Sequence, residues 1–283
     1  MLWFKRRAAP TWRYQTPESH GENRMKVWRL LPGTGVLVVE LRDEEKKLAE
    51  FSGIDIASGT VLWQNFGLPE PWWVTFDRIY KDVLFIHQFV RPDMPHTMRI
   101  FAVDLFTGKL IWENSDCKLL TINDDIVYGL KDSFQGQEII GMNYKDGEEM
   151  IRFSSKDPRV EEFKDNTETQ YLLPEPIEDE ERVKSLFSDI RTPYMPNLIS
   201  LSNKLIVGFY LESGFDEKGV QLYDSHIRIV DLLGKVLYDD VPDKGVHVPM
   251  NDFYFVVGDL SDNERKFLIY VKESVQILSF ALD

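Results

Sequence analysis

The sequence predicts an all-β fold, a β-propeller made of repeated strand meanders. A phrase of Asp, two residues, Ser or Thr, Gly, three residues and Trp occurs at residues 55–63 and again at 104–112, with weaker copies at 143–147 and 231–238. A turn that returns after about 40 to 50 residues is typical of a repeat architecture. The structural repeat residues are Asp55, Gly59 and Trp63 in the first copy and Asp104, Gly108 and Trp112 in the second.

The chemistry of the phrase explains how it reverses the chain. Asp104 can accept hydrogen bonds from backbone N–H groups in its own turn. Gly108 occupies the position where a hairpin of this kind needs a left-handed residue before the returning strand. Trp112 lies on that strand, and we expect its large side chain to pack against a neighbouring sheet. Ile151 takes the tryptophan position in the third copy.

Runs rich in β-branched and aromatic residues fill the sequence between the turns and predict strands. In chain order the predicted strands are 36–41, 48–56 and 60–64; 73–76, 83–90, 98–103 and 109–112; 119–122, 126–128, 137–142 and 149–153; 198–201, 205–210, 225–230 and 236–238; and 253–257, 266–271 and 274–280. Each group is a meander that would leave two apolar faces and exposed edges if it stood alone. Radial stacking covers these faces, so we predict a single propeller domain over residues 1–283 with five blades.

Residues 154–197 interrupt the repeat. They are rich in Asp, Glu and Pro, with five acidic residues between Glu175 and Glu181. We predict an acidic excursion within the domain. The alternative is an eroded sixth blade around residues 169–173, which is less favoured because a blade core needs more than one apolar run.

The two ends of the chain complement each other. The last unit offers three clear strands, while residues 12–16 form a strand candidate that has no partner nearby in the sequence. We predict that this N-terminal strand adds to the last sheet and closes the final blade.

Residues 102–112 closely resemble the tryptophan docking motif of the PQQ-like, quinoprotein-type β-propeller repeats, and residues 54–63 resemble it nearly as well. In that family the tryptophan packs against the turn of the next blade. The repeat serves both quinoprotein dehydrogenases and propellers without catalytic activity, so the resemblance implies a scaffold rather than a reaction. The dehydrogenases have eight blades, and many carry a vicinal disulfide, whereas this chain is shorter and has one cysteine. The resemblance therefore implies a bacterial propeller family outside the dehydrogenases.

The composition limits the classes of partner and of metal site that the chain can have. The formal net charge of −14 disfavours binding to nucleic acid. Cys117 is the single cysteine, which excludes an internal disulfide framework and a cysteine-based metal site. No targeting signal and no apolar stretch of membrane-spanning length is evident in the sequence. We therefore expect a cytoplasmic, soluble monomer with no membrane span.

No catalytic, cofactor-binding or metal-binding constellation stands out, and no cofactor is expected. The five histidines show no ligand spacing, and His87 and His226 are interpreted as structural groups within strands. The tentative ligand or partner contacts are Trp72, Trp73, Arg91 and His96. Two adjacent tryptophans on an extended segment cannot face the same side. Either one enters the core and the other reaches the surface, or both pack into cores on opposite sides.

These observations favour a binding or interaction scaffold whose partner, a protein or a small ligand, meets loops at one mouth of the ring. The alternative is an enzyme, glycosidase-like or lyase-like, that acts on a small polar ligand in the central channel.

Overall fold

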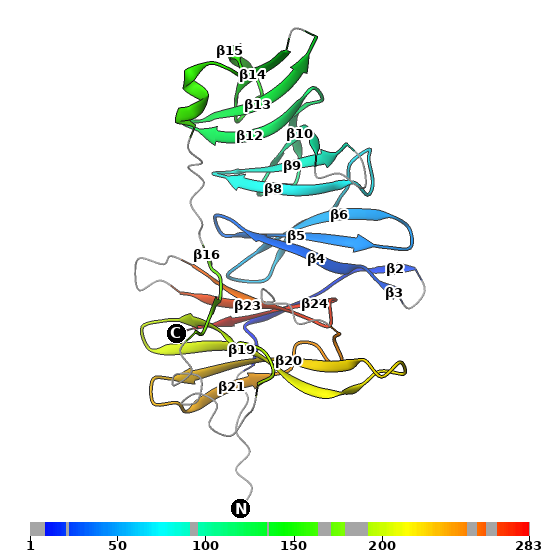
Figure 1. Ribbon diagram of the computed structural model, residues 1–283, viewed down its shortest axis with the longest axis vertical. Coiled ribbons are helices and arrows are strands. Elements are labelled where there is room, and N and C mark those ends of the chain that lie inside the picture. Colours follow the sequence, from blue (N-terminus) through cyan, green and yellow to red (C-terminus); the bar gives the residue numbers. More distant parts are fainter. Residues whose placement is uncertain are drawn as a thin grey trace, which may run out of the picture. The chain divides into compact units, whose positions relative to one another are not determined.

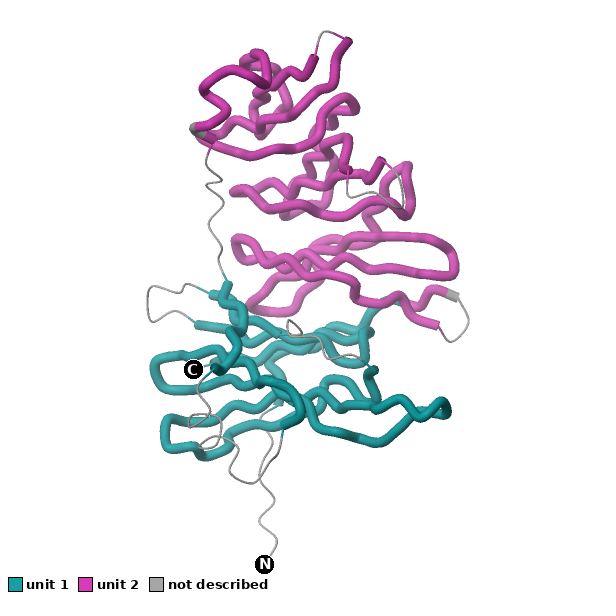
Figure 2. The backbone as a smooth tube through the Cα atoms, in the orientation of Figure 1, with its two compact units in different colours: residues 1–17, 170–283 teal, residues 18–169 magenta. Residues whose placement is uncertain are grey.

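The computed structural model describes residues 9–20, 23–90, 96–134, 136–163, 171–178, 192–247, 254–258 and 265–282. The regular structure in these residues is β-strand except for one 3₁₀ helix, Pro158–Glu162 (Figure 1). The all-β class is therefore confirmed. The chain divides into two compact units, residues 18–169 and residues 1–17 with 170–283 (Figure 2).

Three four-stranded sheets, all antiparallel meanders, follow one another along the chain in the unit of residues 18–169. Sheet 1 consists of β4 (Lys26–Pro32), β5 (Val36–Asp43), β6 (Leu48–Asp55) and β7 (Val61–Phe66); sheet 2 of β8 (Val74–Tyr80), β9 (Val83–Phe89), β10 (Thr97–Asp104) and β11 (Leu110–Asn114); sheet 3 of β12 (Cys117–Asn123), β13 (Ile126–Ser133), β14 (Gly136–Asn143) and β15 (Glu149–Ser154). A ribbon of β2 (Glu18–His20) and β3 (Asn23–Arg24) precedes them. The prediction of three strands in the first unit was wrong, because it omitted β4.

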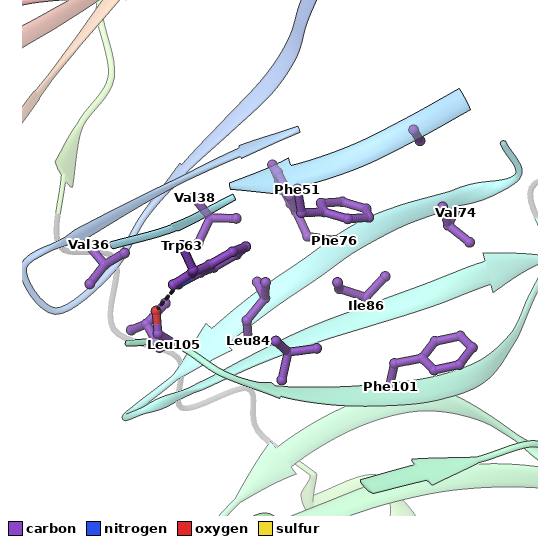
Figure 3. Packing of buried hydrophobic residues seen from close by; sticks show 12 residues of the cluster. Val36, Val38, Phe51, Trp63, Val74, Phe76, Leu84, Ile86, Phe101 and Leu105 are labelled. Carbon is purple, nitrogen blue, oxygen red and sulfur yellow. Dashed lines mark hydrogen bonds between the residues drawn. The ribbon is translucent and has the colours of Figure 1, made fainter. Parts of the chain in front are cut away.

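The sheets of this unit pack face to face through apolar side chains. Along β9, Leu84 and Ile86 belong to the buried cluster shared with sheet 1 (Figure 3), while Val83 and Phe85 belong to the cluster shared with sheet 3. Successive side chains of a strand point to opposite faces, so a strand covered on both sides needs an unbroken apolar run. This explains why β9 begins with four consecutive apolar residues.

The repeated turns have the predicted geometry. Asp104 Oδ1 accepts hydrogen bonds from the backbone N–H of Thr107, at 2.7 Å, and from the Thr107 hydroxyl, at 2.8 Å. Gly108 has a φ of +66°, and Gly59 has a φ of +74°. A side chain at either glycine would be strained in this left-handed region, so the sequence phrase encodes the turn directly.

The tryptophan of each repeat binds the turn of the next sheet. Trp63 on β7 is buried, and its Nε1–H donates to the carbonyl of Leu105 at 2.8 Å, within the turn that follows β10 (Figure 3). Trp112 on β11 likewise donates to the carbonyl of Tyr144 at 2.9 Å. The predicted packing of these side chains against a neighbouring sheet is confirmed. The two tryptophans thus brace sheet 1 to sheet 2 and sheet 2 to sheet 3.

The other unit contains two five-stranded sheets. Sheet 4 consists, in spatial order, of β17 (Glu175–Pro176), β18 (Asn197–Ser200), β19 (Lys204–Phe215), β20 (Gln221–Asp231) and β21 (Val236–Asp240); sheet 5 of β1 (Trp12–Gln15), β24 (Gln276–Ala281), β23 (Phe267–Lys272), β22 (Tyr254–Val257) and β16 (Tyr171–Leu172). Ile206 and Ile227 of sheet 4 share a buried cluster with Val256 and Leu268 of sheet 5. The five main sheets of the described residues are therefore divided between the two compact units, three in one and two in the other.

The N-terminal strand pairs as predicted. β1 runs antiparallel to β24, with Trp12 opposite Ser279 and Gln15 opposite Gln276. Trp12 and Tyr14 point inward and are buried. The first described strand of the chain therefore completes its last sheet.

Part of the acidic segment 154–197 joins sheets already described. Its residues Tyr171–Leu172 pair with β22, and Glu175–Pro176 pair with β18. Phe163, just after the 3₁₀ helix, packs on Tyr128 of sheet 3 with ring centroids 4.3 Å apart. The described residues of this segment form no sheet of their own; residues 164–170 and 179–191 lie outside the described residues, so the excursion remains a prediction.

Candidate functional site

The structure places two of the four tentative contact residues beside a polar cluster. Trp72 and Trp73 lie just before β8, both half-buried, with ring centroids 6.4 Å apart and ring planes at 77°. Core packing of both side chains is therefore wrong. His96 is exposed before β10, and Arg91 lies outside the described residues. Trp72 contacts Arg42 of sheet 1.

A β-bulge positions the first of these partners. β4 and β5 pair Val27 with Leu41 and Arg29 with Glu40, which leaves Trp28 as an extra residue without a partner in the ladder. A bulge of this kind redirects a side chain and is common next to binding and active sites. Trp28 is 51% exposed, which is unusual for a tryptophan.

Trp28, Arg42, Trp72 and Lys47 form an alternating stack of rings and cations, called here the tryptophan–arginine ladder. The Arg42 guanidinium carbon lies 5.1 Å from the ring centroid of Trp28 and 4.6 Å from that of Trp72. Lys47 Nζ lies 5.0 Å from the ring centroid of Trp72. Each contact is a cation–π interaction, which is strengthened by the partial exclusion of water.

Hydrogen bonds fix the orientation of Arg42 in the ladder. Its Nε–H donates to Glu40 Oε1 at 2.7 Å, its Nη2 donates to the carbonyl of Val74 at 2.7 Å, and its Nη1 donates to the carbonyl of Trp72 at 3.0 Å. The Arg42 side chain is 7% exposed and that of Glu40 is fully buried. A buried ion pair of this kind is a weak source of net stability, but it defines a single geometry.

The same cluster extends to Arg29. Thr75 Oγ1 donates to Glu40 Oε2 at 2.6 Å and accepts a hydrogen bond from Arg29 Nη1 at 2.8 Å. Arg29 also donates to the carbonyl of Phe76, at 3.2 Å. β8 is an edge strand of sheet 2, and the arginines of sheet 1 thus bind its carbonyls at residues 74 and 76 and the carbonyl of Trp72 just before it.

A second polar group occupies the equivalent level of sheet 2. In sheet 1, Val36 pairs with the repeat residue Asp55, and Glu40 lies four residues after Val36. In sheet 2, Val83 pairs with the repeat residue Asp104, and His87 lies four residues after Val83. His87 Nδ1 is 3.2 Å from Asp77 Oδ2, and Asp77 is the bulged residue of β8. His87 Nε2 is buried and has no hydrogen-bond partner. One ring nitrogen of His87 thus has a partner, and the interpretation of His87 as a structural group stays a prediction.

The electrostatics of this pair favour an ionised carboxylate. Burial, the largest single effect, raises the pKa of Asp77. Hydrogen bonds with His87 and Arg78, together with the positive charge beside the carboxylate, outweigh burial, so the pKa of Asp77 lies below its usual range. An ionised Asp77 can accept a hydrogen bond from Nδ1–H of His87.

Other candidate chemistry is limited in the described part of the chain. No group of three or more His, Cys, Asp or Glu side chains is arranged there to hold a metal ion. Cys117 is buried, which raises the pKa of its thiol to about 11, so it is a poor nucleophile at neutral pH. None of the described helices combines the length and apolar character needed to cross a bilayer.

Comparisons with solved structures give distant similarities. The chain is 12% identical to the β-propeller domain of the trilobed protease from Pyrococcus furiosus, described as having an open velcro topology, with a TM-score of 0.32 over 88% of this chain and 64% of that chain. It is 10% identical to AztD from Citrobacter koseri, with a TM-score of 0.26 over 92% and 74% of the two chains. It is 12% identical to an endo-arabinase from Bacteroides thetaiotaomicron, with a TM-score of 0.26 over 98% and 97%. This chain thus spans less than two thirds of the first of these structures, and similarities of this size define no activity.

The sequence comparisons reach part of the chain. No curated protein matches it. Residues 31–112 match a family described as a domain of unknown function, DUF4905. The matched residues run from β4 to β11 and include Glu40, Arg42 and Trp72 of the polar cluster, together with both repeat tryptophans.

Proposed function

We propose that the protein is a non-catalytic binding scaffold, and that the tryptophan–arginine ladder is part of its contact surface. The observation that carries the proposal is Trp28, an indole held on a buried, ion-paired guanidinium while half of its surface remains exposed. Tryptophan and arginine are enriched among the residues that dominate binding energy. A rigid side chain also loses little conformational entropy when a partner binds.

The scaffold itself is proposed to be a single five-bladed propeller of the PQQ-like type. The supporting observations are five sheets with meander connections, tryptophans that brace one sheet to the turn of the next, and an N-terminal strand that completes the last sheet. Closure of the ring can be tested by small-angle scattering of the purified monomer, because a closed ring and an extended row of sheets differ in their maximum dimension.

The binding proposal is tested with a panel of sugars, amines, carboxylates and nucleotides in a thermal unfolding assay. We expect at least one compound to raise the unfolding temperature of the wild type and to be recovered chemically unchanged. The Trp28→Ala and Trp72→Ala variants should lose the shift, whereas Phe215→Ala, which removes an exposed ring from the other unit, should retain it. A panel that shifts nothing, or shifts all four proteins equally, contradicts the proposal.

A second candidate function is an enzyme, glycosidase-like or lyase-like, for a small polar ligand. The specific observation in its favour is the Asp77–His87 pair, because a carboxylate that orients one ring nitrogen leaves the other free for proton transfer. The test is turnover of aryl glycosides and uronides by the wild type and by His87→Gln. Turnover that is lost in His87→Gln and kept in Trp28→Ala would favour the enzyme over the scaffold.

A further inference from the structure

We infer that the ladder binds a small planar anion, an aromatic ring that bears a carboxylate or phosphate group, with the ring stacked on Trp28 and the anionic group on Arg29. This inference rests on the proposed function and names the ligand class of the same site. It depends on three properties of the ladder: an open ring face, unpaired positive charge, and rigidity.

The open face belongs to Trp28. Arg42 covers one side of its indole, and the side chain is nonetheless 51% exposed. Half of the side chain surface is thus left uncovered, and we place the ligand ring on the indole surface that Arg42 does not occupy. Planar bases stack on aromatic side chains of this kind in proteins that bind single-stranded nucleic acid, and the stacking contributes to affinity.

The unpaired charge belongs to Arg29, which follows Trp28 in β4, and to Lys47 at the far end of the ladder. Among the described residues, no carboxylate lies within ion-pair distance of Arg29 or of Lys47, although Lys26 pairs with Glu44 at 2.9 Å nearby. Glu40 already neutralises Arg42 inside the ladder. The ladder therefore presents an excess of positive charge on a chain whose formal net charge is −14.

The charge distribution favours a small anion over other ligands. A cation on Trp28 would be repelled by Arg29, and a neutral ring would gain no electrostatic attraction from it. Nucleic acid would bring its long negative backbone against an acidic protein. A small anion avoids this repulsion, because interactions beyond about 8–10 Å are largely screened at physiological salt.

Rigidity adds specificity for a planar group. Arg42 is held by three hydrogen bonds and lies between two indoles, and Arg29 is held by Thr75 and the carbonyl of Phe76. The guanidinium of Arg29 is the group best suited to a two-pronged contact with a carboxylate or a phosphate. Both positions are fixed by sheet pairing before any ligand arrives.

The inference is tested by calorimetric titration with four probes: 2-naphthoate, adenosine monophosphate, adenosine and inorganic phosphate. We expect 2-naphthoate or adenosine monophosphate to bind at least about tenfold more tightly than adenosine, and phosphate alone to show no binding, since each tenfold corresponds to about 1.4 kcal/mol.

Variants assign the binding to the ladder. Trp28→Ala should lower the affinity for the anionic probe by about tenfold or more. Trp28→Phe, which keeps a ring, should lower this affinity by less than about threefold. Arg29→Gln should weaken the anionic probes and leave adenosine unchanged, whereas Arg13→Gln, at an exposed arginine of the other unit, should change nothing. If Trp28→Ala does not fold, Trp28→Phe and Arg29→Gln carry the test.

Two outcomes would overturn the inference. One is binding of no anionic probe, or binding that is equal in the wild type and in a folded Trp28→Ala or Arg29→Gln variant. The other is Trp28-dependent binding of a neutral sugar or a cation without binding of the anions. That second outcome would contradict the proposed ligand class but still agree with a binding scaffold, so the experiment distinguishes failure of one proposal from failure of the other.

Discussion

Trp63 and Leu105 connect two sheets through one hydrogen bond, in which the indole Nε1–H of Trp63 donates to the Leu105 carbonyl at 2.8 Å. The indole also lies directly over Gly108 in the same turn, so the contact combines apolar area with one polar bond. Trp63→Ala should lower the free energy of unfolding by about 3–5 kcal/mol, and Trp63→Phe should lower it by less, since most of the ring remains. Urea unfolding measures both. Leu233→Ala, at a side chain that is 94% exposed, is the control and should change stability by less than about 0.5 kcal/mol.

Gly108 should tolerate no side chain. Its φ is +66°, and a Cβ atom there would lie 2.5 Å from the Trp63 indole. Gly35 is a matched control, because its φ is +73° but a Cβ atom there would meet no atom within 4 Å. We expect Gly35→Ala to destabilise by about 1–2 kcal/mol and Gly108→Ala by about 2–5 kcal/mol. Equal effects of the two changes in thermal or urea unfolding would show that the indole can move aside at little cost.

The buried pair of Glu40 and Arg42 should show strong coupling. Arg42→Met leaves the Glu40 carboxylate buried without its cation and should cost about 3–5 kcal/mol. The double variant Glu40→Gln with Arg42→Met should recover much of this loss. A double-mutant cycle in urea gives the coupling energy. A coupling energy near zero would mean that water reaches the carboxylate in the single variant.

Removal of residues 1–16 should destabilise the whole of sheet 5. It removes β1, exposes the edge of β24, and takes away the buried side chains of Trp12 and Tyr14. We expect a lower midpoint of thermal unfolding and a greater tendency to aggregate. Removal of residues 1–8 alone is the control, since it leaves β1 in place. An unchanged midpoint after removal of residues 1–16 would contradict the role of β1.

Asp77 gives a pH dependence with a definite sign. Because its pKa in the folded protein is lowered, its contribution to stability is present above the ordinary pKa of about 4 and is lost as the pH falls through the lower folded value. The free energy of unfolding of the wild type should therefore fall more steeply than that of Asp77→Asn as the pH falls below about 4. Equal slopes would show that Asp77 is not stabilised by His87 and Arg78.

Asp243 should give a pH dependence of stability with the opposite sign. Burial raises the pKa of its carboxyl, so its contribution to stability is present below the ordinary pKa and is lost as the pH rises through the folded value. Asp243→Asn should therefore lack a loss of stability that the wild type shows as the pH rises above about 4. If the free energy of unfolding of Asp77→Asn and that of Asp243→Asn depend on pH in the same way, the pH dependence comes from general acid unfolding and not from these two carboxyls.

Local chemistry made much of the fold predictable from the sequence. The turn at Asp104–Gly108 needs one side-chain acceptor and one left-handed residue, and both are visible in the sequence. The strand β4 was missed because the bulge at Trp28 breaks the alternation of inward and outward residues. A bulge depends on the partner strand, so periodicity within a single strand does not reveal it.

The candidate site was predictable in part for a similar reason. The Trp72–Trp73 pair stands out as an unusual dipeptide, and Trp72 does lie in the ladder. Glu40 and Arg42 have charged neighbours in the sequence and resemble the solvated end of a strand. Their burial depends on sheet 2, whose first strand begins about 30 residues later. A contact between sheets leaves no local signature, although an Arg two residues from a Glu within an apolar strand is a signal worth testing.

The tryptophan brace has a direction. Trp63 and Trp112 both reach forward to the sheet that follows them, and the series stops at sheet 3, where Ile151 lacks an indole N–H. Within residues 18–169 sheet 2 is therefore joined by an indole hydrogen bond on each of its faces, whereas sheets 1 and 3 are each joined by one. The middle sheet of this unit should accordingly be the last of the three to separate under mechanical load.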